Sequence, residues 1–188
     1  MTQPSSEGIV LIVDDTPANL GVLHGALSRE QLDVLMASDG VTGLEVARSE
    51  APDLILLDVV MPELDGIEVC RRLKADPRTH DIPVMFMTAL GDTRDRLLGF
   101  EVGAVDYITK PFQEGELIAR IRTQLSLRRM TRALQLQNLH LEEQIRERTA
   151  AQAAREKLTE ELRAAYGRLE EELAMRAQAE ATRVRLQE

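Results

Sequence analysis

Four short, largely apolar segments in the first 110 residues constrain the fold more than any other feature of this chain. They occupy residues 9–13, 54–57, 84–87 and 105–108, and stretches with a helix-like spacing of apolar residues separate them. Apolar runs of this length between helices are typical of parallel strands that are buried on both faces. Strands that alternate with helices form right-handed crossover units. We therefore predict a doubly wound α/β domain.

A fifth and shorter strand is expected at residues 34–36, which completes a five-stranded parallel sheet. Pro17 suits the first turn of a helix, because its missing N–H has no partner there in any case. Gly103 is placed to end a helix with a C-cap. The helices are expected from residue 17 onward, at residues 40–50, 67–74 and 92–102, and from residue 113 onward.

Polar residues follow four of these strands. Asp14 and Asp15 follow the first strand, Asp58 follows the third, Thr88 follows the fourth, and Lys110 comes just after the last. In sheets of this class, ligands bind outside the carboxyl ends of the strands. The pattern therefore predicts a site at one sheet edge, made of three carboxylates, one hydroxyl and one ammonium group.

Three carboxylates that converge to within about 4 Å repel one another by several kcal/mol per pair. One of them must then be protonated, or a cation must lie among them. Mg²⁺ suits this donor set, because it binds a few carboxylates and completes its shell with water and phosphate oxygens. A carboxylate, a metal ion, an ammonium group and a hydroxyl together favour phosphoryl transfer. No histidine or cysteine accompanies them, so acyl transfer and zinc-dependent hydrolysis fit poorly.

Charge and composition exclude several classes of protein. The net charge is −9, of which residues 1–112 carry −10 and residues 113–188 carry +1, so no basic surface for nucleic acid is expected. The single cysteine, Cys70, excludes an internal disulfide. No apolar run reaches membrane-spanning length, and the N-terminus lacks the features of a signal peptide. We therefore expect a cytoplasmic protein.

From residue 113 onward the composition is helical, with no proline and with apolar residues at heptad spacing. A lone helix of this length has no core to pack on, so a two-stranded coiled coil is favoured over a helix folded back on itself. Asn138 at a core position favours a parallel, in-register dimer. Arg148 and Arg155 weaken the middle of the seam. The predicted seam consists of Leu127, Leu134, Asn138, Leu141, Ile145, Leu162, Tyr166, Leu169 and Leu173.

Several motifs resemble the receiver domain of two-component response regulators, and they occur in the order and at the separations of that family. They are Asp14-Asp15, the segment 58–66 (Asp-Val-Val-Met-Pro-Glu-Leu-Asp-Gly), Thr88-Ala89, and the segment 107–112 (Tyr-Ile-Thr-Lys-Pro-Phe). The resemblance covers residues 8 to about 125. It implies a flavodoxin-like sheet with the strand order 2-1-3-4-5.

The resemblance also implies a role for each matching residue. Asp58 would be the phosphoacceptor, which takes a phosphoryl group from the phosphohistidine of a sensor histidine kinase or phosphotransfer protein. Mg²⁺ would be held by Asp14, Asp15, Asp58 and the backbone carbonyl of Val60. Lys110, Thr88 and Ala89 would lie beside the phosphate, and Tyr107 would be the aromatic residue that responds to a movement of Thr88. The peptide bond before Pro111 would be cis.

These features predict three regions: a disordered N-terminus at residues 1–7, a receiver at 8–125, and a coiled-coil helix at 126–188 that continues the last receiver helix. We expect no enzymatic activity beyond self-phosphorylation and autodephosphorylation, because the Asp-x-Asp motif of aspartyl-phosphate phosphatases is missing. The favoured function is a receiver that signals through a dimeric coiled coil to an output domain beyond residue 188. The alternative is a stand-alone phosphorelay or scaffold protein that binds partners through its coil.

Overall fold

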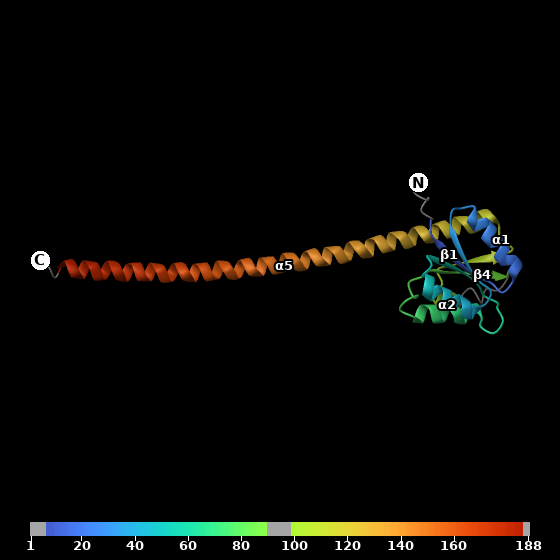
Figure 1. Cartoon of the computed structure of the whole chain (residues 1–188), viewed down its shortest axis with the longest axis horizontal. Helices are drawn as coiled ribbons and strands as arrows, with labels where there is room; N and C mark the ends of the chain where they lie inside the picture. The colour runs from blue at the N-terminus through green and yellow to red at the C-terminus, as the bar shows by residue number, and fades with distance from the viewer. Residues whose placement is uncertain (1–6, 90–98, 186–188) are drawn as a thin grey trace. The chain divides into compact units, whose positions relative to one another are not determined.

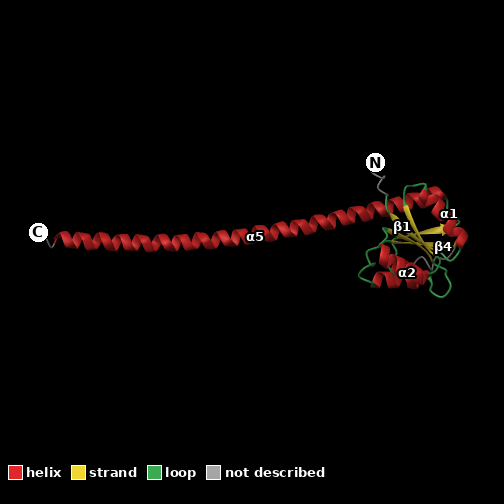
Figure 2. Cartoon of the chain, viewed as in Figure 1, coloured by secondary structure: helices red, strands yellow, loops and turns green. Residues whose placement is uncertain are grey.

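The computed structural model describes residues 7–89 and 99–185, and the side chains of residues 89 and 178–185 are left out of the description. Its sheet has five parallel strands in the order β2-β1-β3-β4-β5. Helices cover both faces of this sheet (Figures 1 and 2). The predicted doubly wound fold and its strand order are therefore confirmed.

The observed elements follow the predicted ranges to within a few residues. The second strand extends one residue further at each end than predicted, because it pairs with the first strand over its whole length. The elements are β1 (Ile9–Val13), α1 (Pro17–Ser28), β2 (Asp33–Ala37), α2 (Gly40–Glu50), β3 (Leu54–Asp58), α3 (Gly66–Ala75), β4 (Val84–Ala89), β5 (Asp106–Lys110) and α5 (Glu114–Arg185).

Two hydrophobic cores lie on opposite faces of the sheet. Successive strand residues point to opposite faces, so Leu11 packs under α2 and α3 while its neighbour Ile12 packs under α1 and α5. The same alternation runs through β3 and β4. Because both faces are covered, the central strands are apolar up to the polar residue at or near their carboxyl ends, which is the pattern that the sequence shows.

The helix predicted at residues 92–102 begins outside the described residues, but its end is visible. Gly103 has a φ of +99°, a backbone conformation that suits glycine. Its N–H donates to the carbonyl of Phe100 at 3.1 Å, and the N–H of Ala104 donates to Gly99 at 3.0 Å. This pair of hydrogen bonds is a Schellman motif, so Gly103 acts as the predicted C-cap.

The helix α5 runs from Glu114 to Arg185, which confirms the long C-terminal helix. Its first part is buried against the sheet through Leu117, Ile121 and Leu125. The chain divides into two compact units, Met1–Arg132 and Ala133–Glu188. In the second unit the predicted seam residues are exposed in the single chain. None of the helices described combines the length and the apolar content that a membrane crossing requires.

Candidate functional site

Three carboxylates meet at the carboxyl edge of the sheet. Asp14 and Asp15 directly follow β1, and Asp58 is the last residue of β3, the strand that pairs with β1. One oxygen from each carboxylate lies within 4.8 Å of the other two. Asp14 is fully buried and Asp58 nearly so, whereas Asp15 is exposed. The structure thus brings together the three acidic residues that the sequence placed at one sheet edge.

Lys110 neutralises part of this negative charge. Its Nζ donates to Asp14 Oδ2 at 2.8 Å and to Asp58 Oδ2 at 2.7 Å. Lys110 is the last residue of β5 and pairs in register with Ala89 at the end of β4. The peptide bond between Lys110 and Pro111 is cis. A single ammonium group therefore bridges two carboxylates that come from different strands.

The electrostatics of the site leave it short of positive charge. Burial raises the pKa of Asp58 above its usual value, and the hydrogen bond from Lys110 only partly opposes this effect. Burial also disfavours the charged form of Lys110, but the hydrogen bonds to Asp14 and Asp58 outweigh it and raise the pKa of the ammonium group. Lys110 therefore stays charged, and in the part of the chain that the structure describes it is the one cation paired with this group of three carboxylates. A divalent cation would restore the balance.

Asn19 is a site residue that the sequence reasoning missed. Its Nδ2 donates to both oxygens of Asp14, at 3.0 and 3.1 Å. The backbone N–H of Thr16, the N-cap residue of α1, also donates to Asp14 Oδ1, at 2.9 Å. These bonds fix the orientation of the buried carboxylate. The signal in the sequence was the position of Asn19 on the first turn of the helix that follows Asp14-Asp15.

The loop after Asp58 is folded tightly against the sheet. The N–H of Gly66 donates to the carbonyl of Val59 at 3.0 Å. Asp65 is the N-cap of α3, and its Oδ1 accepts from the N–H of Glu68 at 2.8 Å. Asp65 therefore stabilises the first turn of α3. The loop leaves Val60, two residues after Asp58, 71% exposed at the surface.

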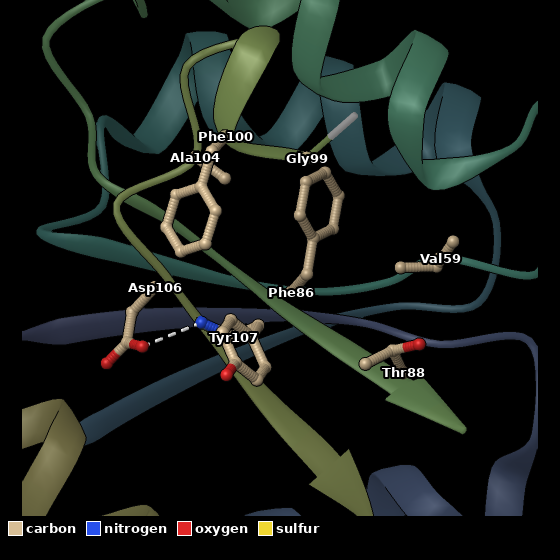
Figure 3. A pocket seen from close by; sticks show the side chains of 8 residues that line it. All are labelled: Val59, Phe86, Thr88, Gly99, Phe100, Ala104, Asp106 and Tyr107. Atoms are coloured by element: carbon tan, nitrogen blue, oxygen red, sulfur yellow. Dashed lines mark hydrogen bonds between the residues drawn. The ribbon is translucent and has the colours of Figure 1, made fainter. Parts of the chain in front are cut away.

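Thr88 and Tyr107 line the same small pocket (Figure 3), and Val59, the residue after Asp58, also lines it. Thr88 is buried and precedes the last residue of β4. The ring of Tyr107 packs edge-on against Phe100, with 5.8 Å between the ring centroids and 80° between the planes. Phe86 forms the pocket wall beside Phe100. The sequence indicated Thr88 and Tyr107, but the phenylalanines around them were missed, because nothing in their spacing distinguishes a pocket wall from ordinary core.

The donor set at the sheet edge fits a hard divalent cation. It offers carboxylate oxygens from Asp14, Asp15 and Asp58, and Mg²⁺ prefers oxygen ligands, with its other positions open to water and phosphate. Lys110 adds a fixed positive charge that pairs with both Asp14 and Asp58. This arrangement can hold a phosphoryl group between a metal ion and an ammonium group, with a carboxylate as the nucleophile.

The family model of response regulator receiver domains matches residues 10–122. This is more than half of the chain. The chain belongs to the response regulator receiver domain family. Such domains act in two-component signalling and bind Mg²⁺ at an acidic cluster of this kind, and most of them are not themselves enzymes.

Curated relatives share the receiver and extend well beyond it. The chain is 47% identical over 116 residues to the DNA-binding dual master transcriptional regulator RpaA of Synechocystis, covering 62% of this chain and 48% of the relative. It is 48% identical over 114 residues to the response regulator PleD of Caulobacter vibrioides, covering 61% of this chain and 25% of PleD. It is 39% identical over 144 residues to a probable cyclic di-GMP phosphodiesterase of Vibrio cholerae, covering 77% of this chain and 32% of that protein. The chain thus spans less than half the length of these relatives.

Solved structures show the same fold. A putative response regulator from Chloroflexus aurantiacus is 34% identical with a TM-score of 0.61, covering 63% of this chain and 98% of that one. The receiver domain of the sensor histidine kinase PA1611 from Pseudomonas aeruginosa is 28% identical with a TM-score of 0.60, again covering 63% and 98%. The PA1611 structure holds a magnesium ion coordinated in its active site cleft.

Proposed function

We propose that the chain accepts a phosphoryl group on Asp58 from the phosphohistidine of a sensor histidine kinase or phosphotransfer protein, in a reaction that requires Mg²⁺. The observation that carries this proposal is the position of the Asp58 carboxylate. It lies close to the carboxylates of Asp14 and Asp15, and it accepts a hydrogen bond from the ammonium group of Lys110 at 2.7 Å. A nucleophile between two positive charges suits an incoming phosphoryl group.

Each neighbouring residue has a distinct role in this proposal. Asp14, Asp15, Asp58 and the backbone carbonyl of Val60 would hold Mg²⁺, which when bound neutralises phosphoryl oxygens. Lys110 binds another phosphoryl oxygen, together with Thr88 and the backbone at Ala89. An Asp58 oxygen then forms a bond to phosphorus while the P–N bond of the donor breaks. The electron pair of that bond stays on the imidazole nitrogen, which takes up a proton from solvent.

Thr88 and Tyr107 would convert this chemistry into a change of shape. Both side chains line one pocket, so a movement of the Thr88 hydroxyl toward the phosphoryl group frees space beside the Tyr107 ring. Tyr107 is half-buried and contacts Phe100 through its ring edge, so it can rotate further inward. The surface formed by β5 and the start of α5 would change accordingly.

The metal requirement gives the first test of the acceptor. Incubation with a small phosphodonor and Mg²⁺ is expected to add one phosphoryl group, and borohydride trapping with peptide mapping is expected to locate it at Asp58. Excess EDTA is expected to abolish the reaction, because among the described residues Lys110 alone then pairs with these carboxylates, and it does not balance the charge of all three. Equal labelling with and without EDTA, or a label at another residue, would contradict the proposal.

We further propose that the receiver signals through a parallel homodimeric coiled coil of α5 to an output domain outside these 188 residues. The seam residues from Leu127 to Leu173 are exposed in the single chain, and a second copy would bury them. The greater length of the curated relatives supports the existence of an output domain. The polar stretch around Arg148 and Arg155 would make the pairing adjustable, so that phosphorylation can change it.

A seam substitution tests the dimer. Leu162→Glu is expected to weaken dimerisation about tenfold or more, because each helix loses one buried leucine and gains a charge at the seam. Leu136→Glu is the control, since Leu136 is exposed but lies off the seam. Sedimentation equilibrium measures both, with and without beryllofluoride and Mg²⁺ as a phosphoryl mimic. Equal weakening by both variants would contradict the seam, and a dissociation constant unchanged by the mimic would contradict the gating.

A further inference from the structure

A second charged cluster lies at the edge of the sheet opposite the acidic site. Three arginines near the end of the first compact unit, Arg128, Arg129 and Arg132, contact the receiver there. Their partners lie just before the strands β1, β3 and β4: the carbonyl of Glu7, the carboxylate of Asp53 and the carbonyl of Asp81. We call these three arginines and Asp53 the arginine clasp.

Asp53 is the centre of the arginine clasp. Its Oδ1 accepts from Arg132 Nη1 at 2.8 Å and lies 3.6 Å from Arg128 Nε. Its Oδ2 accepts from the N–H of Ile9 at 3.1 Å, and its own N–H donates to the carbonyl of Ile9 at 2.7 Å. One aspartate therefore joins the start of β1, the start of β3 and two side chains of α5.

Arg128 is buried to an unusual degree for a charged residue. Its side chain is only 9% exposed, and its Nε has no hydrogen-bond partner among the described residues. Its Nη1 donates to the carbonyl of Asp81. Burial, and after it the charge of Arg132, lowers the pKa of this guanidinium, and the charges of Asp53 and Asp81 oppose these effects. A buried cation is tolerated when it is paired, so Asp53 determines whether this turn of α5 can stay docked.

The three strands that the arginine clasp contacts are the ones that carry the site at their other ends. β1 leads to Asp14 and Asp15, β3 ends at Asp58, and β4 contains Thr88. These strands have five or six residues each and are almost completely buried, so they connect the two sheet edges over about 15–20 Å. The end of the first unit is thus tied to the residues that lead directly into these three strands.

We propose that the arginine clasp docks residues 126–132 of α5 on the receiver, so that they move as one body with the strands that carry the acidic site. Asp53 is the positioning residue of this docked segment, which ends at Arg132, the last residue of the first compact unit. The docking does not depend on phosphorylation. That this docking transmits the effect of phosphorylation to the rest of α5 rests on the proposed function. The docking itself is tested without phosphodonor or metal.

Hydrogen–deuterium exchange on the full chain tests the docking. Asp53→Asn is expected to speed amide exchange in residues 126–132 about tenfold relative to the strands, because it removes the charge that compensates Arg128. Asp33→Asn is the matched control: it makes the same charge change at the start of β2, which pairs with β1, and the side chain of Asp33 has no hydrogen bond or ion pair among the described residues. Exchange in the Asp33→Asn variant is expected to equal that of the wild type.

A second variant keeps the test valid if Asp53→Asn lowers overall stability. Arg132 is half exposed, so Arg132→Ala leaves the core intact and is expected to speed exchange in the same residues, whereas Arg146→Ala in the second unit is not. In the double variant Asp53→Asn with Arg132→Ala, the two effects are expected to be less than additive. Unchanged exchange in residues 126–132, an equal increase throughout the strands, or strict additivity would each overturn the proposal.

Discussion

Asp58→Asn is expected to leave no detectable phosphoryl group on the protein after incubation with a small phosphodonor and Mg²⁺. A neutral amide is not a nucleophile toward phosphorus, and the substitution also removes one of the three carboxylates proposed to hold the metal ion. Intact-protein mass spectrometry measures the result. Asp65→Asn is the matched control, because it removes the same charge in the same loop while asparagine still caps α3. The Asp65→Asn variant is expected to label like the wild type.

Loss of labelling in the Asp58→Asn variant would show that the acceptor carboxylate is missing, because the variant is expected to remain folded. Burial raises the pKa of Asp58, so the folded protein binds this proton more tightly than the unfolded chain does. The stability that this residue contributes is therefore present at low pH. It is lost as the pH rises above about 4, the pKa of an aspartate in the unfolded chain, and through the higher pKa of the folded state. The amide does not ionise, so without Mg²⁺ the variant is expected to be at least as stable as the wild type at neutral pH. A full phosphoryl label on it would exclude Asp58 as the acceptor.

The sequence predicted the fold and the acidic cluster well because both depend on local patterns. Apolar runs bounded by helices determine buried strands, and the residue that ends such a strand must lie at the carboxyl edge of the sheet. Asp14, Asp15 and Asp58 could therefore be placed together without knowledge of any contact between them. Lys110 followed by the same reasoning, although it lies 52 residues after Asp58.

The arginine clasp could not be predicted, because its pairing depends on contacts between distant parts of the chain. Arg128 and Asp53 are 75 residues apart, and Arg128 lies in a helix in which most of the other described charged residues are exposed. In a heptad pattern, the side chain of an arginine next to a seam position is expected to be exposed to solvent. Only the docking of α5 onto the sheet shows that this arginine is buried. The first compact unit therefore extends to Arg132, whereas the heptad pattern alone begins at Leu127.

Gly66→Ala is expected to destabilise the receiver by about 3 kcal/mol, more than most overpacking substitutions do. A Cβ at this position would lie 2.1 Å from the carbonyl oxygen of Asp58 and 3.0 Å from the Cα of Val59. Both are backbone atoms, so no side-chain rotation can relieve the clash. The Gly66–Val59 hydrogen bond of 3.0 Å holds the two segments together and would have to lengthen. Urea unfolding followed by circular dichroism measures the loss.

The control for this substitution is Gly21→Ala on α1, where nothing lies within 4 Å of the added Cβ. Alanine in a helix has less conformational freedom to lose than glycine, so this variant is expected to gain about 0.5–1 kcal/mol. The clash at Gly66 also displaces the backbone of residues 58–60, from which the acceptor carboxylate and the proposed carbonyl ligand project. Phosphorylation of the Gly66→Ala variant is therefore expected to slow even where the protein remains folded. If both variants were equally stable and labelled at the same rate, the close approach of Gly66 to the backbone of Asp58 and Val59 would have no part in positioning the acceptor carboxylate.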